Sequence, residues 1–246
     1  MSSRSKAPKS GKSVNSAAKH LSESDAKLIS NDVGHFSMVR NFALADVITL
    51  MNGMCGTMSI FSSMRYLVSN DRCDLHTAMW FMPFGLLFDF LDGRVARWRN
   101  NSSLLGQELD SLADLISFGL APAALAFAVG MRTRLDAFGL TYFVCCGLAR
   151  LARFNATVAL FPKDATGKVS HFEGLPIPSS LAIVGFLAYS INGLNLSNTD
   201  KFPLSILQLP MPMGINAKYG EIHHFTLLFV MHGTAMISRT LRIPKP

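Results

Sequence analysis

The sequence predicts an all-α, polytopic integral membrane protein with six transmembrane helices. Three observations support this prediction. Of the 246 residues, 49% are hydrophobic and only 16% are charged, and the mean hydropathy is +0.28, which lies outside the usual range of soluble domains. A bilayer core about 30 Å thick requires about 20 mainly apolar residues per helix, and six stretches approach that length. Several stretches contain ionisable residues, which in membranes usually face a protein interior or a wet cavity.

These six stretches define a single transmembrane domain, which we expect to cover residues 36–246. The expected spans are residues 43–64, 76–97, 108–130, 136–160, 177–194 and 221–238. His223 and His224 begin the last span and are expected at the membrane interface. Residues 1–35 are polar and contain no apolar run, so we expect a disordered, basic tail in the cytosol. Because residues 1–20 are basic and free of acid, a mitochondrial presequence is the alternative.

The distribution of basic residues tests this topology. If the N-terminal tail is cytosolic, six spans return the C-terminus to the cytosol. Seven basic residues then precede the first span and ten more lie in cytosolic segments, which makes 17 of the 23 Lys and Arg residues. The excess agrees with the positive-inside rule. The net charge is +7. A basic excess can indicate nucleic-acid binding, but the apolar composition argues against that partner here.

Two stripes of acidic and small residues lie between Phe88 and Ser117. The first stripe, at helical spacing, contains Asp89, Asp92, Gly93, Ala96 and Arg97, and the second contains Gly106, Asp110 and Asp114. Residues i, i+3, i+4, i+7 and i+8 share one face of a helix. Asn100 to Ser103 offer turn and capping chemistry between the stripes, so two antiparallel helices can turn their acids toward each other.

Four carboxylates gathered at membrane depth repel one another unless cations neutralise them. Oxygen ligands favour Mg²⁺ or Mn²⁺ over zinc, and two such ions about 3.5 to 4 Å apart can clamp a phosphoryl group. Gly93 and Ala96 leave room for a ligand near the backbone, and Arg97 offers a fork for phosphate. The alternative is that the acids form a solvated ion network with Arg94, Arg97 and Arg99. Eight specific residue types at fixed spacing favour a functional site instead.

The complete pattern, D-x2-D-G-x2-A-R-x8-G-x3-D-x3-D, resembles the signature of the CDP-alcohol phosphotransferase family at every position. The resemblance implies a six-helix membrane fold, usually paired as a homodimer. It implies that Asp89, Asp92 and Asp110 hold metal, and that Asp114 contributes to the metal site and is the candidate general base. It also implies that Gly93, Arg97 and Gly106 contact the CDP moiety, with Ala96 beside them. Asn52 on the first span can line the same cavity, although helix packing is an alternative role.

The acceptor alcohol must be recognised by other residues. CGLARLARFN, which ends at Asn155, resembles the LRLARFN element of the family's phosphatidylserine synthases, and FEGLPIPSS, residues 172–180, resembles another element of that subfamily. The resemblance implies L-serine as acceptor, with Arg150 or Arg153 holding its carboxylate and Phe154 or Glu173 meeting its ammonium group. The alternative is that both arginines are positive-inside flanks and Phe154 is an interfacial aromatic residue.

These resemblances imply an enzyme that transfers the phosphatidyl group of CDP-diacylglycerol to L-serine, with its active site and both termini on the cytosolic side of the endoplasmic reticulum. Inositol and glycerol 3-phosphate are alternative acceptors for the same donor chemistry. Hydropathy alone also allows a membrane metal-ion or solute carrier with acids in discontinuous helices.

Overall fold

A computed structural model describes residues 44–98, 104–160, 171–193, 206–208, 220–238 and 242–244. These residues are almost entirely helical, apart from two short two-stranded sheets. The tail expected at residues 1–35 and the turn expected at residues 100–103 lie outside the described residues, so both stay predictions.

Each of the six expected spans corresponds to helical structure. The bounds are α3 (Leu44–Ser69), α4 (Arg72–Trp98), α5 (Leu104–Asp114) followed by the π-helical turn η1 (Leu115–Leu120) and α6 (Ala121–Val129), α7 (Arg134–Leu160), the 3₁₀ turn η2 (Ile177–Ser179) with α8 (Ser180–Gly193), and α9 (His224–Ile237). The sixth helix therefore begins at His224. His223 directly precedes this helix and is buried against the protein at 6% exposure, and its position at the membrane interface stays a prediction.

Three helical stretches, Leu44–Ser69, Leu105–Val129 and Arg134–Ala156, are long and apolar enough to cross a membrane. Helix α4 has sufficient length, 27 residues, but its last turns carry several charged side chains. Helices α8 and α9 have 14 residues each, fewer than the roughly 20 that a straight crossing requires. The fold class is thus all-α with membrane-spanning helices, and the number of six crossings stays a prediction.

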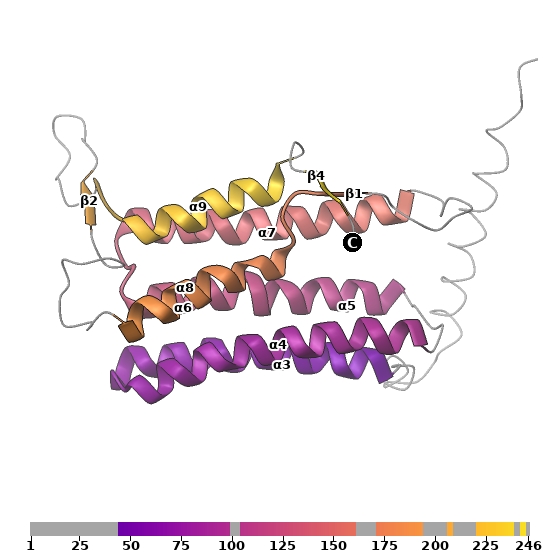
Figure 1. The fold of residues 1–246 in the computed structure, drawn as a ribbon, viewed down its shortest axis with the longest axis horizontal. Coiled ribbons are helices and arrows are strands. Elements are labelled where there is room, and N and C mark those ends of the chain that lie inside the picture. Colours follow the sequence, from indigo (N-terminus) through magenta and orange to yellow (C-terminus); the bar gives the residue numbers. More distant parts are fainter. Residues whose placement is uncertain are drawn as a thin grey trace, which may run out of the picture. The chain divides into compact units, whose positions relative to one another are not determined.

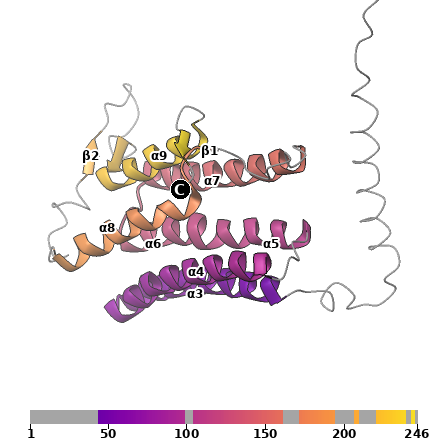
Figure 2. The same cartoon turned by 45° about the vertical axis from the view of Figure 1, so that its right-hand side comes forward.

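The helices within residues 44–244 form an antiparallel pair and a parallel pair, α7 with α9, with one long rod between the two pairs. Helix α3 pairs with α4, and α7 pairs with α9, while α5, η1 and α6 run as one continuous rod between the pairs (Figure 1, Figure 2). Strand β1 (His171–Glu173) pairs antiparallel with β4 (Arg242–Pro244) after the ends of α7 and α9. Strand β2 (Ile206–Gln208) pairs with β3 (Glu221–His223) just before α9. The ends of α7 and α9 are therefore held together.

Helix α3 turns its polar face inward. Its buried residues include Asp46, Thr49, Asn52, Gly56, Ser59, Ser62 and Ser63, whereas Leu50, Met54, Phe61 and Met64 are exposed. Small and polar residues let membrane helices pack closely, and lipid solvates apolar side chains. This pattern is typical of a lipid-facing helix, and it directs hydroxyl, amide and carboxyl groups toward α4 and α5.

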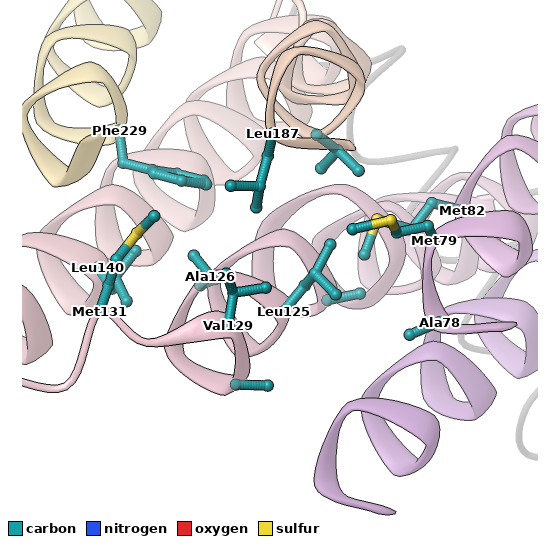
Figure 3. Packing of buried hydrophobic residues seen from close by; sticks show 14 of the residues in the cluster. Ala78, Met79, Met82, Leu125, Ala126, Val129, Met131, Leu140, Leu187 and Phe229 are labelled. Carbon is teal, nitrogen blue, oxygen red and sulfur yellow. The ribbon is translucent and has the colours of Figure 1, made fainter. Parts of the chain in front are cut away.

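The apolar core lies around α6, which is buried over most of its length. It is built from residues of α4, α6, α7, α8 and α9, and Figure 3 labels Ala78, Met79, Met82, Leu125, Ala126, Val129, Met131, Leu140, Leu187 and Phe229. Phe143 and Phe229 meet edge to face with ring centroids 5.1 Å apart. The core residues of α4 come from its first turns, and those of the α5–α6 rod come mainly from α6. The opposite ends of α4 and of the α5–α6 rod therefore remain for polar groups.

Candidate functional site

Three carboxylates from α4 and α5 converge. Asp89 and Asp92 lie near the end of α4, and Asp110 lies in the second half of α5. One carboxylate oxygen from each of the three lies within 4.8 Å of the other two. Asp92 is buried at 6% exposure, and the other two are half-buried. The structure therefore brings together the first three acids of the sequence pattern on two consecutive helices.

Asp114, the last acid of the pattern, lies beside this trio. The Asn52 Nδ2 group of α3 donates to Asp114 Oδ1 at 3.2 Å. The carboxyl groups of Asp89 and Asp114 lie close enough to interact. On the side of α7, Arg150 is near enough for its charge to act on Asp114. This acid thus connects the carboxylate trio with a neutral amide on one helix and a guanidinium group on another.

Helix α3 contributes two further polar groups that were not singled out from the sequence. Thr49 Oγ1 donates to Asp92 Oδ2 at 2.6 Å. Asp46, one turn earlier on α3 and only 5% exposed, lies close enough for its charge to act on Asp92. The spacing of Asp46, Thr49 and Asn52 at i, i+3 and i+6 is the signal that could have revealed this face, since polar residues are costly in an apolar span.

The trio fits a hard divalent cation. Asp110 Oδ1 is buried and has no hydrogen-bond partner among the described residues, although buried polar atoms normally have one. All three groups offer oxygen, which Mg²⁺ and Mn²⁺ prefer. The alternative ion network finds little support in the part of α4 that is described, because the Arg94 guanidinium lies over the Phe90 ring, 5.1 Å from its centroid.

The residues expected to contact CDP are only partly described. Beside Gly93 there is open space among the described residues, because no atom outside the neighbouring turns of α4 lies within 4 Å of the position where a Cβ would be. Gly106 lies in the first turn of α5 and is partly exposed, and Asn52 is fully buried beside Asp114. Ala96 and Arg97 belong to α4, but their side chains lie outside the described part, so their contact with CDP stays a prediction.

The residues expected to bind the acceptor separate into two places. Arg150 is half-buried and lies close enough to Asp114 for their charges to interact. Its Nε has no hydrogen-bond partner among the described residues. Arg153 instead donates from an Nη atom to the Ile237 carbonyl oxygen at 3.3 Å, at the end of α9. Phe154 is 45% exposed. Glu173 lies in β1, and its side chain is outside the described part of the chain.

A polar bridge holds α7 against α5 beside these groups. Asn155 Nδ2 donates to Glu108 Oε2 at 3.1 Å. Ser111 Oγ lies 3.1 Å from Asn155 Oδ1, to which it can donate. Glu108 and Ser111 are three residues apart on α5 and so share one face. The single amide of Asn155 therefore sets the register between the helix that bears Asp110 and Asp114 and the helix that bears Arg150.

Comparison with known proteins identifies the class. Residues 42–215 match the CDP-alcohol phosphatidyltransferase family. Because this match covers more than half of the chain, the chain belongs to that family. It is accordingly an integral membrane protein, and its carboxylate cluster lies within the matched residues.

Several relatives are similar over most of their length. CDP-diacylglycerol–serine O-phosphatidyltransferase of Saccharomyces cerevisiae is 50% identical over 224 residues, which are 90% of this chain and 78% of the relative. The Bacillus subtilis enzyme of the same name is 36% identical over 61% of this chain and 78% of its own length. Archaetidylserine synthase of Methanothermobacter thermautotrophicus is 33% identical over 71% of this chain and 72% of its own length.

Proposed function

We propose that this protein transfers the phosphatidyl group of CDP-diacylglycerol to L-serine and releases phosphatidylserine and CMP. The observation that carries the proposal is the convergence of Asp89, Asp92 and Asp110 within 4.8 Å beside Asp114, in a chain that is 50% identical to a CDP-diacylglycerol–serine O-phosphatidyltransferase. The family membership supports the donor chemistry, and the relatives' names support the acceptor.

Asp89, Asp92 and Asp110, with a contribution from Asp114, would hold two Mg²⁺ or Mn²⁺ ions. Members of the family use divalent metals, and the partnerless Asp110 Oδ1 supports this assignment here. Such ions supply neutralisation of the charge on a pyrophosphate group, which is the main requirement of phosphoryl transfer. The open space beside Gly93 would admit the CDP moiety close to α4, with Ala96, Arg97, Gly106 and Asn52 around it.

The remaining residues bind, orient and accept a proton. The serine hydroxyl oxygen forms a bond to the phosphorus that bears diacylglycerol, the bond from that phosphorus to the CMP oxygen breaks, and Asp114 takes the hydroxyl proton. Asn52 orients the Asp114 carboxyl group through its 3.2 Å hydrogen bond. Both substrates meet in one cavity, so we expect sequential kinetics without a covalent phosphatidyl-enzyme.

The acceptor would be held at the end of α7. Among the described residues, Arg150 is a cation close to Asp114. Its guanidinium group is therefore well placed to bind the serine carboxylate next to the candidate base Asp114. Arg153, Phe154 and Glu173 would complete this pocket, for which Arg153 must exchange its hydrogen bond to the Ile237 carbonyl oxygen for one to the substrate. We also propose six membrane crossings, a homodimer in the endoplasmic reticulum, and termini and active site on the cytosolic side, in agreement with the distribution of basic residues.

The decisive experiment offers CDP-diacylglycerol and Mn²⁺ or Mg²⁺ to the purified protein, with serine, inositol and glycerol 3-phosphate in parallel reactions. We expect CMP release and a lipid product with serine alone. CMP release with a different alcohol would show that serine is not the acceptor, while the proposed donor chemistry would still hold. If no alcohol leads to CMP release, a carrier function becomes the better interpretation.

The acceptor pocket can be tested with single arginine substitutions. Arg150→Ala and Arg153→Ala should each raise the serine KM about tenfold or more, because a charge-assisted bond to the carboxylate is lost. The KM for CDP-diacylglycerol should change much less. Arg132→Ala is a matched control, because Arg132 donates to the Phe127 and Ala128 carbonyl oxygens at the end of α6, far along the chain from the acids. An unchanged serine KM in either variant would remove that arginine from the pocket.

A further inference from the structure

The π-helical turn Leu115–Leu120 begins directly after Asp114. Within it the Ala121 N–H donates to the Ile116 carbonyl oxygen, five residues back rather than four. Pro122 follows in the next turn, and proline has no N–H to donate to the carbonyl four residues earlier, which here belongs to Phe118. Single π-turns are rare and are frequently found at functional sites. Pro122 accounts for both the wide turn and a carbonyl group without its usual donor.

A residue from a different helix supplies the missing donor. Ser180 Oγ, at the beginning of α8, donates to the Phe118 carbonyl oxygen at 2.7 Å. Ser180 and Phe118 are both fully buried, so water cannot replace this hydrogen bond. An unsatisfied buried carbonyl is costly in a membrane protein. The hydroxyl group of Ser180 therefore stabilises the wide form of the turn.

The same turn is held on its opposite side by α3. Ser117 Oγ donates to the Asn52 carbonyl oxygen at 2.9 Å, and the Asn52 side chain donates to Asp114. Gly56 permits this approach, because a Cβ at that position would lie 2.7 Å from Ser117 Cα and 2.9 Å from its backbone nitrogen. Three hydrogen bonds, joined through the covalent chain of Phe118, Ser117 and Asn52, thus link α8 through the π-turn and α3 to the Asp114 carboxyl group.

We propose that Ser180 is a positioning residue of the reaction, which acts by holding the π-turn in the form that places Asp114 against Asn52 and Asp89. This inference rests on the proposed function, in which Asp114 accepts the serine proton. A π-turn contains one more residue between hydrogen-bond partners than an α-turn. Relaxation to a regular α-helix would consequently rotate Asp114 relative to Ser117 and move its carboxyl group away from Asn52.

The test compares Ser180→Ala with Ser180→Thr in the purified full-length protein. Ser180→Ala should lower kcat for serine-dependent CMP release about tenfold or more, because small misplacements of a catalytic group have large effects. Both KM values should stay within about twofold. Ser180→Thr keeps the hydroxyl group and should restore most of the kcat.

Ser59→Ala is the matched control. Ser59 Oγ also makes a buried hydrogen bond to a backbone carbonyl of another helix, that of Ala78 at 2.8 Å, but it is not connected to Asp114. The two alanine variants should lose similar thermal stability, while only Ser180→Ala loses kcat. If Ser180→Ala loses the same stability and retains the wild-type kcat, Ser180 is merely structural and the inference is wrong.

Pro122→Ala gives a second test that does not depend on the folding of Ser180→Ala. It returns an N–H to position 122 and favours a regular helix, so the melting temperature should stay equal or rise while kcat falls. Wild-type kcat in Pro122→Ala would overturn the inference. A wild-type protein that makes no CMP with serine would refute the proposed function itself, whereas an active wild type with unaffected variants would refute only the role of the π-turn.

Discussion

Buried carboxylates occur in two regions of this protein, and their surroundings differ. Asp136, at the beginning of α7, is fully buried and accepts hydrogen bonds from the His223 and Thr133 backbone N–H groups at 2.9 and 3.0 Å and from Thr226 Oγ1 at 2.7 Å. The His223 ring also contacts it through Nδ1. Asp110, in the cluster on α4 and α5, has an Oδ1 atom without any partner among the described residues.

The difference lies in the number of donors around each acid. Thr133 and Asp136 bond to each other's backbone N–H groups, at 3.0 and 3.1 Å, and form a capping box at the beginning of α7. Asp136 therefore stabilises the fold. The cluster instead gathers carboxylates with few donors, which is unfavourable unless a cation is bound. Burial alone does not distinguish a structural acid from a functional one, whereas the balance of donors does.

The largest expected effect is on catalysis. Asp89→Asn and Asp110→Asn keep the side-chain shape and remove one charge each, and each should lower CMP release about a thousandfold or more. The melting temperature should stay equal or rise, because repulsion within the cluster decreases. Activity assays and thermal melts of the purified variants measure both quantities. Wild-type turnover in either variant would refute the assignment of the trio as metal ligands.

The opposite result is expected at the other region. Asp136→Asn replaces an acceptor oxygen by an amide donor that faces other donors, and should lower the free energy of unfolding by about 2 to 4 kcal/mol. The kcat of the folded fraction should not change, because Asp136 belongs to the capping network of α7 and α9. Thermal melts in detergent together with activity per folded molecule test this expectation. A strong loss of kcat at unchanged stability would mean that Asp136 has a role in the reaction.

The smallest expected effect is the stabilisation of the protein by bound metal in the absence of substrates. It distinguishes the carboxylate cluster directly from the region around Asp136. Mn²⁺ at about one hundred times its Kd should stabilise the wild-type protein by about 2.7 kcal/mol. The same Mn²⁺ concentration should stabilise Asp136→Asn by a similar amount and Asp110→Asn much less. Melting curves with Mn²⁺ and with a chelator provide the measurement. An undiminished Mn²⁺ effect in Asp110→Asn would place the ion elsewhere.

Much of the fold was predictable from the sequence because its signals are local. The expected spans correspond to α3, α4, the α5–α6 rod, α7, α8 and α9. The convergence of Asp89, Asp92 and Asp110 follows from helical spacing on two consecutive helices joined by a short connection. Pro122 was visible in the sequence, but a π-turn could not be inferred from it, because the donor that stabilises the turn is Ser180, 62 residues away from Phe118.

By itself, the sequence determined the apolar helices and the stripes of acids on them, since helical periodicity depends only on neighbouring residues. The tertiary structure decided which carboxylates find donors. Thr49 reaches Asp92 across 43 residues and Thr226 reaches Asp136 across 90, while Asp110 Oδ1 finds no partner among the described residues. Whether a buried oxygen is satisfied depends on groups that only packing brings within 3 Å or so, and this property separates the structural acid from the cluster proposed to bind metal.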